Sequence, residues 1–274
     1  MKTMTTSHPA ALATQEHLVA LDIDGTLADG GLIPDITATA VRDVVTAGHH
    51  LVLATGRSLV GVAPVIKRLG LRSGRVICSN GAVTARINGR RLVVEDVVSF
   101  DAGPAMRRVC AAIPDVLMAS EALGKGYRVN VRFPDELLAG RQYTVWRERD
   151  LWAVPTTRAV VFAPDVTSMA HELRPFDVTA TPGSTVVGDW LDLTAPNLSK
   201  ATALEAVRRR VLVAPEHTVA VGDGHNDLSM LKWAARGVAM AGAPAEVRAT
   251  ADEVCGSIAE HGAVGVLRAM AEMP

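Results

Sequence analysis

The segment at residues 18–31, LVALDIDGTLADGG, combines a buried strand with two closely spaced acids. Its apolar strand formers end in Asp22 and Asp24, and Gly25 and Thr26 follow at once. Carboxylates at the end of a buried strand cost free energy unless a cation or hydrogen bonds compensate them. The rest of the chain is therefore expected to supply a partner for these two acids.

The composition is that of an ordinary soluble globular protein. Of 274 residues, 49% are hydrophobic and 21% charged, with 28 basic against 29 acidic side chains. This balance argues against a nucleic-acid partner or a polybasic membrane surface. No apolar run approaches the roughly 20 residues of a membrane span. The length exceeds that of one compact core, so two domains, or one domain with a large insertion, are expected.

Two features bear on the cellular compartment. Residues 1–16, MKTMTTSHPAALATQE, lack the continuous apolar core of a signal peptide and are predicted to be a disordered leader. Cys78, Cys110 and Cys255 are widely spaced and form no CxxC pair, which favours reduced thiols over a disulfide framework or a zinc site. A cytoplasmic location is predicted.

Both ends of the chain alternate strand and helix patterns. The expected strands begin near residues 17, 50, 75, 218 and 237, and the expected helices near residues 35, 58, 197 and 226, with a last helix ending around residue 270. Such alternation predicts an α/β fold with a Rossmann-like, doubly wound parallel sheet.

The middle of the chain breaks this pattern. Two strand-like runs flank Asn88-Gly89, which is a strong hairpin signal, and mixed helices and short strands follow. The predicted organisation is a core of residues 17–82 and 191–274 with an inserted α+β module of residues 83–190.

Polar residues gather where strands of the core are expected to end, which is where open parallel sheets bind ligands. They are Asp22, Asp24, Thr55, Gly56, Arg57, Lys200, Asp223 and Asp227. Each has an ordinary explanation when taken singly: Asp227 as a helix cap, Thr55 as a turn residue, Lys200 as a solvated helix residue, and the neighbouring His225 as a surface residue.

The combination of these residues favours a metal and a phosphate. Two carboxylates about 4 Å apart repel by about 4 kcal/mol at an effective dielectric constant of 20, so converging acids need a cation. Oxygen ligands suit Mg²⁺, while a lysine, a threonine hydroxyl and the N–H groups of glycine turns suit an anion.

The ordered motifs resemble those of the haloacid dehalogenase superfamily. They are DIDGTL at Asp22, ATGR at Ala54, the lysine entering a helix at Lys200, and GDGHND at Gly222. SNGA at Ser79 and WLDLTAPNLSKATAL at Trp190 are similar to the Cof-like branch. That resemblance implies a large α/β cap inserted between the second and third motifs.

The resemblance also implies a role for each position. Asp22 would be the nucleophile that forms an aspartyl-phosphate, and Asp24 the acid–base residue, provided that the chain bends at Ile23. Thr55 and Lys200 would complete the catalytic set by gripping the phosphoryl oxygens.

Further residues would bind the substrate and the metal. Gly56, Arg57, Asn80 and Asn226 are the implied substrate contacts. Mg²⁺ would be held by the Asp22 carboxylate, the main-chain carbonyl of Asp24 and Asp223, with Asp227 orienting them. The family often reads AMGNA where this chain has Ala239–Ala243, so Gly242 replaces an asparagine and one substrate or metal contact is put in doubt.

The implied function is Mg²⁺-dependent hydrolysis of a small phosphorylated metabolite, such as a sugar phosphate, by a monomer or homodimer. A phosphotransferase or phosphomutase stays open, and so does a non-catalytic metabolite-binding regulator. A glycosyltransferase DxD site would leave Lys200 and GDGHND unexplained. Four arginines of strand-like segments assigned to the cap are candidates to meet an anionic substrate: Arg86, Arg128, Arg132 and Arg158.

Overall fold

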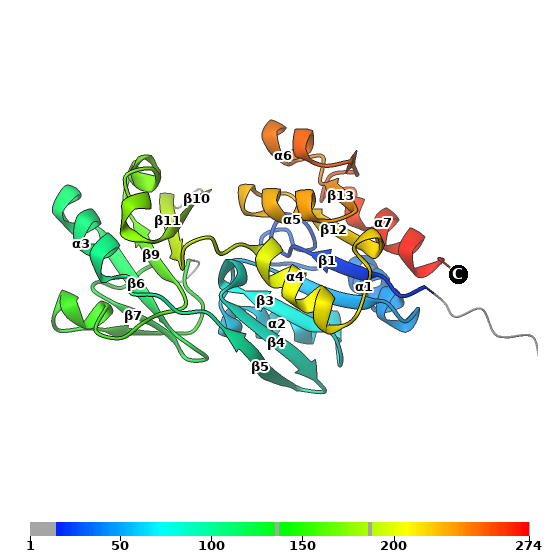
Figure 1. Cartoon of the computed structure of the whole chain (residues 1–274), viewed down its shortest axis with the longest axis horizontal. Helices are drawn as coiled ribbons and strands as arrows, with labels where there is room; N and C mark the ends of the chain where they lie inside the picture. The colour runs from blue at the N-terminus through cyan, green and yellow to red at the C-terminus, as the bar shows by residue number, and fades with distance from the viewer. Residues whose placement is uncertain (1–14, 135–136, 186–187, 274) are drawn as a thin grey trace, which may run out of the picture.

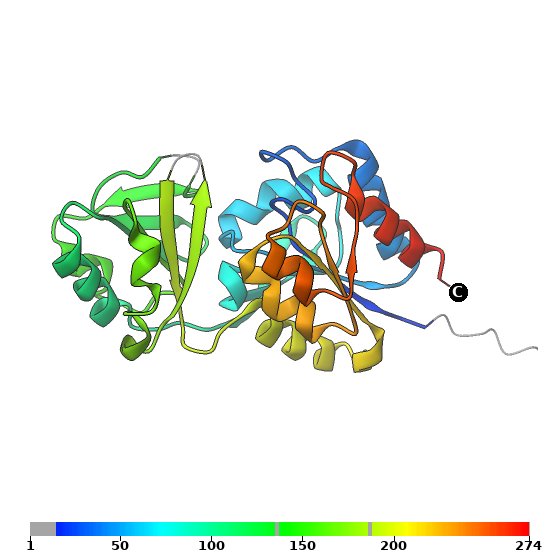
Figure 2. The same ribbon diagram turned by 90° about the horizontal axis from the view of Figure 1, so that it is seen from above.

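Two β-sheets organise the chain in the computed structural model, which describes residues 15–134, 137–185 and 188–273 (Figure 1). An eight-stranded sheet contains the N- and C-terminal parts of the chain, and a six-stranded sheet contains the middle. The two parts lie side by side along the long axis of the molecule, in both Figure 1 and Figure 2. Residues 1–14 of the predicted leader lie outside the described residues.

The eight-stranded sheet is a doubly wound core, as predicted. Its strands are β1 (Leu18–Leu21), β2 (His50–Ala54), β3 (Arg75–Cys78), β4 (Val83–Asn88), β5 (Arg91–Val97), β12 (Thr218–Gly222), β13 (Arg236–Ala239) and β14 (Glu253–Val254). They follow the order β14-β13-β12-β1-β2-β3-β4-β5, parallel from β14 to β3. Since β1 lies between β2 and β12, the strand order reverses there and opens a crevice at the carboxyl ends.

Helices cover both faces of this sheet. One face carries α1 (Asp35–Thr46), α2 (Leu59–Leu69) and α7 (Gly262–Ala271), and the other carries α4 (Lys200–Arg210), α5 (Leu228–Trp233) and α6 (Ala245–Thr250). In β1, Val19 and Leu21 pack on the first face, whereas Leu18 and Ala20 pack on the second. Side chains of a strand alternate, so Asp22 continues the second series toward α4.

Helix boundaries follow local backbone chemistry. Ser58 caps α2 by accepting a hydrogen bond from the Gly61 N–H, and Gly70, at φ 71°, ends that helix. The predicted helix start at Asn197 is wrong by three residues. Asn197 has a left-handed φ of 58°, and α4 begins only after Ser199, whose side chain accepts from the Thr202 N–H.

The inserted module forms the six-stranded sheet, hereafter the cap. It contains α3 (Gly103–Ala112), β6 (Leu117–Ala122), β7 (Gly126–Val129), β8 (Arg141–Thr144), β9 (Ala159–Phe162), β10 (Thr179–Thr185) and β11 (Gly188–Thr194), in the strand order β10-β11-β9-β6-β7-β8. Leu191 and Leu193 pack in the same apolar cluster as Met106 and Val109 of α3. Asp192, between the two leucines, therefore lies on the opposite face of the cap sheet.

Short 3₁₀ turns connect these elements: η1 (Ser79–Gly81), η2 (Glu148–Leu151), η3 (Val166–Ala170), η4 (Arg174–Phe176), η5 (Pro215–His217) and η6 (His225–Asp227).

The hairpin at residues 83–97 belongs to the core, which corrects the predicted start of the module at residue 83. β4 pairs antiparallel with β3, from Cys78↔Val83 onward, and β5 forms the sheet edge. The Asn88-Gly89 dipeptide indicates a hairpin but not the sheet that the hairpin joins. The strands of the cap sheet begin only at Leu117 and end at Thr194, a few residues beyond the predicted limit of 190.

Two further expectations from the sequence concern membrane-spanning helices and disulfide bonds. Among the described residues, every helix is too short or too polar to cross a membrane. Cys78, Cys110 and Cys255 form no disulfide.

The turn after β3 packs closely on the start of α4. Gly81 has φ 114°, and a Cβ at this position would lie 2.4 Å from the carbonyl oxygen of Ser199. Gly89, at the tip of the hairpin, has φ 64°, and a Cβ at this position would have no atom within 4 Å. Both glycines need left-handed freedom, but only Gly81 also needs the missing side chain.

Gly81→Ala is therefore expected to lower the free energy of unfolding by at least about 2 kcal/mol, because strain and a backbone clash add. Gly89→Ala is the matched control and is expected to cost about 1 kcal/mol from backbone strain alone. Urea denaturation of the two variants measures both values. Equal losses would contradict the close approach of the turn to α4.

Candidate functional site

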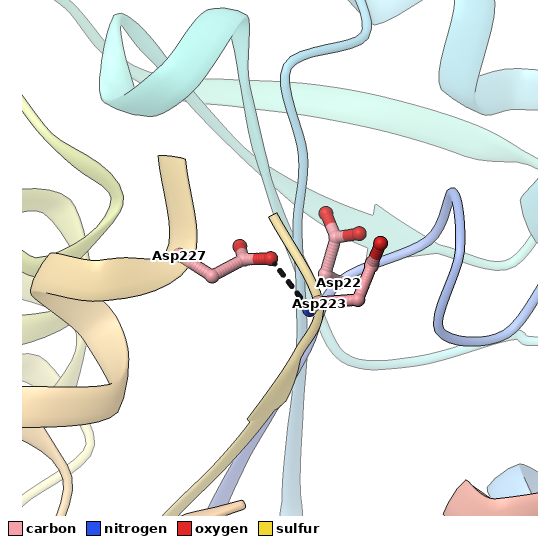
Figure 3. A group of neighbouring side chains, drawn as sticks. All are labelled: Asp22, Asp223 and Asp227. Carbon is pink, nitrogen blue, oxygen red and sulfur yellow. Dashed lines mark hydrogen bonds between the residues drawn. The ribbon is translucent and has the colours of Figure 1, made fainter. Parts of the chain in front are cut away.

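Three carboxylates converge at the carboxyl ends of β1 and β12. Asp22 follows β1 directly, Asp223 follows β12, and Asp227 ends the 3₁₀ turn η6 (Figure 3). One oxygen from each lies within 4.8 Å of the others. The parallel pairing of β1 with β12, Leu21 opposite Val221, brings these distant segments to one sheet edge. The predicted convergence of Asp22, Asp223 and Asp227 is thus present in the structure.

Lys200 is the cation inside this cluster. Its Nζ donates to Asp22 Oδ1 at 2.5 Å and to Asp227 Oδ1 at 2.6 Å, and its side chain is fully buried. Ser199 caps α4 immediately before it, so the first helical residue projects its side chain into the crevice. This burial excludes the alternative of a solvated helix lysine.

Negative charge nonetheless exceeds positive charge in the cluster. Three acids face one ammonium, and burial followed by the charge of Asp227 raises the pKa of Asp22 well above its ordinary value. The same two causes raise the pKa of Asp223 to about 6. Burial by itself lowers the pKa of the Lys200 ammonium. The negative charges of Asp22 and Asp227 outweigh burial, so this pKa lies above its ordinary value. The excess of carboxylates over cations is what a site for a divalent cation with oxygen ligands would have.

Both carboxylate oxygens of Asp227 accept hydrogen bonds from the protein. While Oδ1 accepts from Lys200, Oδ2 accepts the N–H groups of Asp223 at 2.9 Å and Gly224 at 2.8 Å. Figure 3 shows the carboxylate of Asp227 turned toward the backbone of Asp223. This arrangement suits a residue that orients the Asp223 loop and leaves Asp22 and Asp223 to face a cation.

The DGT turn lets Asp223 approach β1. Gly25 has φ 85°, and a Cβ there would lie 2.1 Å from Asp223 Oδ2. Thr26, which was not among the predicted site residues, donates from Oγ1 to Asp223 Oδ1 at 2.9 Å. Its place in the DIDGT motif, two residues after Asp24, was the available signal.

Asp24 leaves the cluster because the chain turns at Ile23. The Ile23 carbonyl accepts from the N–H groups of Leu27 and Ala28 at 2.9 and 2.8 Å, so the backbone reverses there. The Asp24 side chain is 54% exposed and binds Arg57 through both oxygens, at 2.7 Å from Nε and 2.5 Å from Nη2. In this conformation the Arg57 guanidinium is therefore paired with Asp24 and not with a substrate.

Four further predicted residues lie together beside β2. The Thr55 Oγ1 accepts from the Arg57 N–H at 3.1 Å, which shapes the strand-end loop. A Cβ on Gly56 would lie 3.2 Å from Asn80 Oδ1 and 3.7 Å from Asn226 Nδ2. Asn226 Nδ2 also donates to Asn80 Oδ1 at 3.1 Å.

Other candidates lie apart from this group. His225 is exposed, as expected for a surface residue. Gly242 is also exposed, with open space around it. Arg86 lies on β4 of the core and pairs with Glu95 at 3.3 Å, so its assignment to the cap was wrong.

Arg158 is the one cap candidate with a buried polar role among the described residues. Its Nε donates to Asp192 Oδ1 at 2.8 Å and its Nη1 to the Tyr127 hydroxyl at 3.0 Å. In this conformation its guanidinium binds residues of the cap itself. A contact with an anionic substrate had been expected instead. Asp192 itself, absent from the sequence-based selection, was signalled only by a lone acid in the apolar run WLDL.

Comparisons with known proteins match the same segments. A family model for haloacid dehalogenase-like hydrolases matches residues 19–108 and 167–267. The phosphoglycolate phosphatase of Methanoculleus marisnigri is 30% identical over 239 residues, which cover 85% of this chain and 87% of that protein. The solved structure of the HAD subclass IIB sugar phosphatase BT4131 has the same fold, with a TM-score of 0.76 and 24% identity over 92% of this chain and 98% of that chain.

One relative is much longer than this chain. The chloroplastic endoribonuclease YBEY of Arabidopsis thaliana is 25% identical over 256 residues, which are 85% of this chain but 43% of that protein. The family model covers most of the chain and includes β1 from Val19 onward, β12 and the helix that carries Lys200. The resemblance read from the motifs is confirmed, and the chain belongs to the haloacid dehalogenase-like hydrolase family.

Proposed function

We propose that this chain is a Mg²⁺-dependent phosphatase that hydrolyses a small phosphorylated metabolite, a sugar phosphate or a similar phosphomonoester. The observation that carries the proposal is the buried Lys200 ammonium between Asp22 and Asp227, with Asp223 beside them. The names of a phosphoglycolate phosphatase and a sugar phosphatase among the similar proteins support the substrate class.

Asp22 is the proposed nucleophile. A carboxylate needs no deprotonating base to attack phosphorus and forms an aspartyl-phosphate directly. Lys200 holds Asp22 at 2.5 Å and keeps a positive charge where negative charge gathers on the transferred group. Mg²⁺, held by Asp22, Asp223 and the main-chain carbonyl of Asp24, would favour the ionised carboxylates and neutralise phosphoryl oxygens.

Asp24 is the proposed acid–base residue. Both of its carboxylate oxygens accept from Arg57 in this conformation, whereas the acid–base steps need one of them free to give a proton to the leaving oxygen and later to take one from water. Protonation of the leaving oxygen in the first step needs the acid form. Arg57 is therefore expected to leave Asp24 when a substrate enters and to bind an anionic or polar group of that substrate.

The strand-end loop of β2 is the proposed phosphoryl cradle. The Thr55 hydroxyl and the N–H of Gly56 lie in the loop beside Asn226, and the fixed donors need no rearrangement during phosphoryl transfer. The predicted cytoplasmic location and the monomeric or dimeric state accompany this proposal and stay predictions. A phosphomutase would share the same first step but release little inorganic phosphate.

Asp22→Asn is expected to lower kcat for phosphomonoesters by at least about 1,000-fold, because an amide does not form the acyl phosphate. The unfolding temperature should not fall, because the change removes one negative charge from a cluster with too few cations. Phosphate release from a panel of sugar phosphates and thermal unfolding measure both effects. Asp29→Asn, an exposed acid of the same segment, is the control and should retain activity. Substantial activity in Asp22→Asn would reject the nucleophile.

Chelation of divalent ions is expected to abolish phosphate release, and added Mg²⁺ to restore it. A carboxylate must lose its proton to bind a metal, and burial raises the pKa of Asp223 to about 6 in the metal-free cluster. The apparent Mg²⁺ affinity should therefore fall as the pH is lowered through about 6. Calorimetric titration between about pH 5 and pH 8 measures this. Turnover that persists without metal, or an affinity that does not change over this range, would count against the cation site.

A further inference from the structure

Three consecutive residues after β3 have left-handed backbone conformations. The φ angles are 50° for Ser79, 54° for Asn80 and 114° for Gly81. Glycine adopts this region freely and asparagine tolerates it, whereas serine does so at a cost. Ser79 and Asn80 are both buried. Strain of this kind persists only where the surroundings hold the residues in place, so the contacts of this turn need an account.

The backbone of the turn supports the proposed phosphoryl cradle. The N–H of Ser79 donates to the Arg57 carbonyl at 2.9 Å, and the N–H of Asn80 donates to the Thr55 carbonyl at 3.1 Å. The Asn80 side-chain oxygen accepts from Asn226 at 3.1 Å. The turn thus connects the cradle loop to the GDGHND loop.

The side chains of the strained pair reach the cap instead. Ser79 Oγ donates to Glu121 Oε2 at 2.7 Å, and Asn80 Nδ2 lies 3.4 Å from Asp192 Oδ2. Glu121 lies on β6 and Asp192 on β11, and both are buried. Two cap carboxylates therefore meet two adjacent residues of the core.

Both of these acids also accept hydrogen bonds within the cap. The Thr157 hydroxyl donates to the same Glu121 oxygen at 2.8 Å. The Arg158 guanidinium donates to Asp192 Oδ1, at 2.8 Å from Nε and 2.5 Å from Nη2. Each of the two carboxylates therefore has a hydrogen-bond partner in the cap as well as one in the turn.

We infer that Glu121 and Asp192 are positioning residues for phosphate binding. By accepting from Ser79 and Asn80, they hold the turn in its left-handed form, and the turn holds Thr55–Arg57 in the shape that grips a phosphoryl group. The inference rests on the proposed phosphatase function and extends it. The cap acts on the phosphate half of the substrate through the turn, in addition to any contact with the leaving group.

Inorganic phosphate is the probe for this inference, because it carries no leaving group for the cap to contact. Ser79→Ala removes the hydrogen bond to Glu121 and leaves the strained backbone unsupported. It is expected to raise the inhibition constant of phosphate about fivefold and to lower kcat/KM by at least that factor, the effect of losing about one hydrogen bond. Glu121→Gln and Asp192→Asn are expected to act in the same direction.

Thr157→Val is the matched control. It removes the other hydroxyl from the same Glu121 oxygen and leaves the bond to the turn, so the inhibition constant of phosphate should stay within about twofold of wild type. Thermal unfolding of every variant accompanies the kinetics. Glu121→Gln, which weakens the acceptor of the Ser79 hydroxyl and leaves the residues of the turn unchanged, serves if Ser79→Ala does not fold, and weaker phosphate binding is again expected.

Three results would overturn the inference: an unchanged inhibition constant in Ser79→Ala, an equal rise in Thr157→Val, or a higher KM for substrate with unaltered phosphate inhibition. The last would assign the two acids to the leaving group. A wild-type protein inactive on every phosphomonoester would refute the proposed function instead. Calorimetric titration of phosphate into wild type and Ser79→Ala would then decide the inference separately, and equal affinities or no binding would overturn it.

Discussion

The site depends on one buried ammonium. Lys200 is fully buried and spans Asp22 and Asp227, so its removal would leave two buried carboxylates without their shared cation. Breaking a buried pair of this kind typically costs about 3–5 kcal/mol. The same contact orients the proposed nucleophile and joins the first strand of the chain to the GDGHND loop. Stability and chemistry therefore both depend on Lys200.

The sheet topology explains why these side chains can meet. β1 lies between β2 and β12, and the reversal of strand order leaves a crevice at the carboxyl ends of all three. The alternation along β1 turns Asp22 toward α4, and the reversal at Ile23 removes Asp24 from the acid cluster. Two acids one residue apart thus obtain different surroundings, one buried against a lysine and one exposed against an arginine.

Most of the site was predictable because each motif lies within a few residues of a strand end. Asp22, Thr55 and Asp223 follow β1, β2 and β12 directly, so the strand pattern alone places them at one edge. The contacts of the cap were not predictable. Glu121 and Asp192 belong to no quoted motif of the active site, and their contacts with Ser79 and Asn80 depend on how the two sheets pack against each other. The same limit explains why the hairpin at residues 83–97 was assigned to the wrong domain. Its turn residues specify a chain reversal but not the strand with which the hairpin pairs.

The pairing of β1 has a consequence for synthesis on the ribosome. Leu18 pairs with His50 on one side and with Thr218 on the other, and the whole cap lies between these two partners in the chain. During translation one edge of the most buried strand stays open until the C-terminal part has emerged, and an open apolar edge invites pairing with other chains. The native order of strands thus makes the early nascent chain vulnerable to aggregation, and long-range pairing of this kind slows folding.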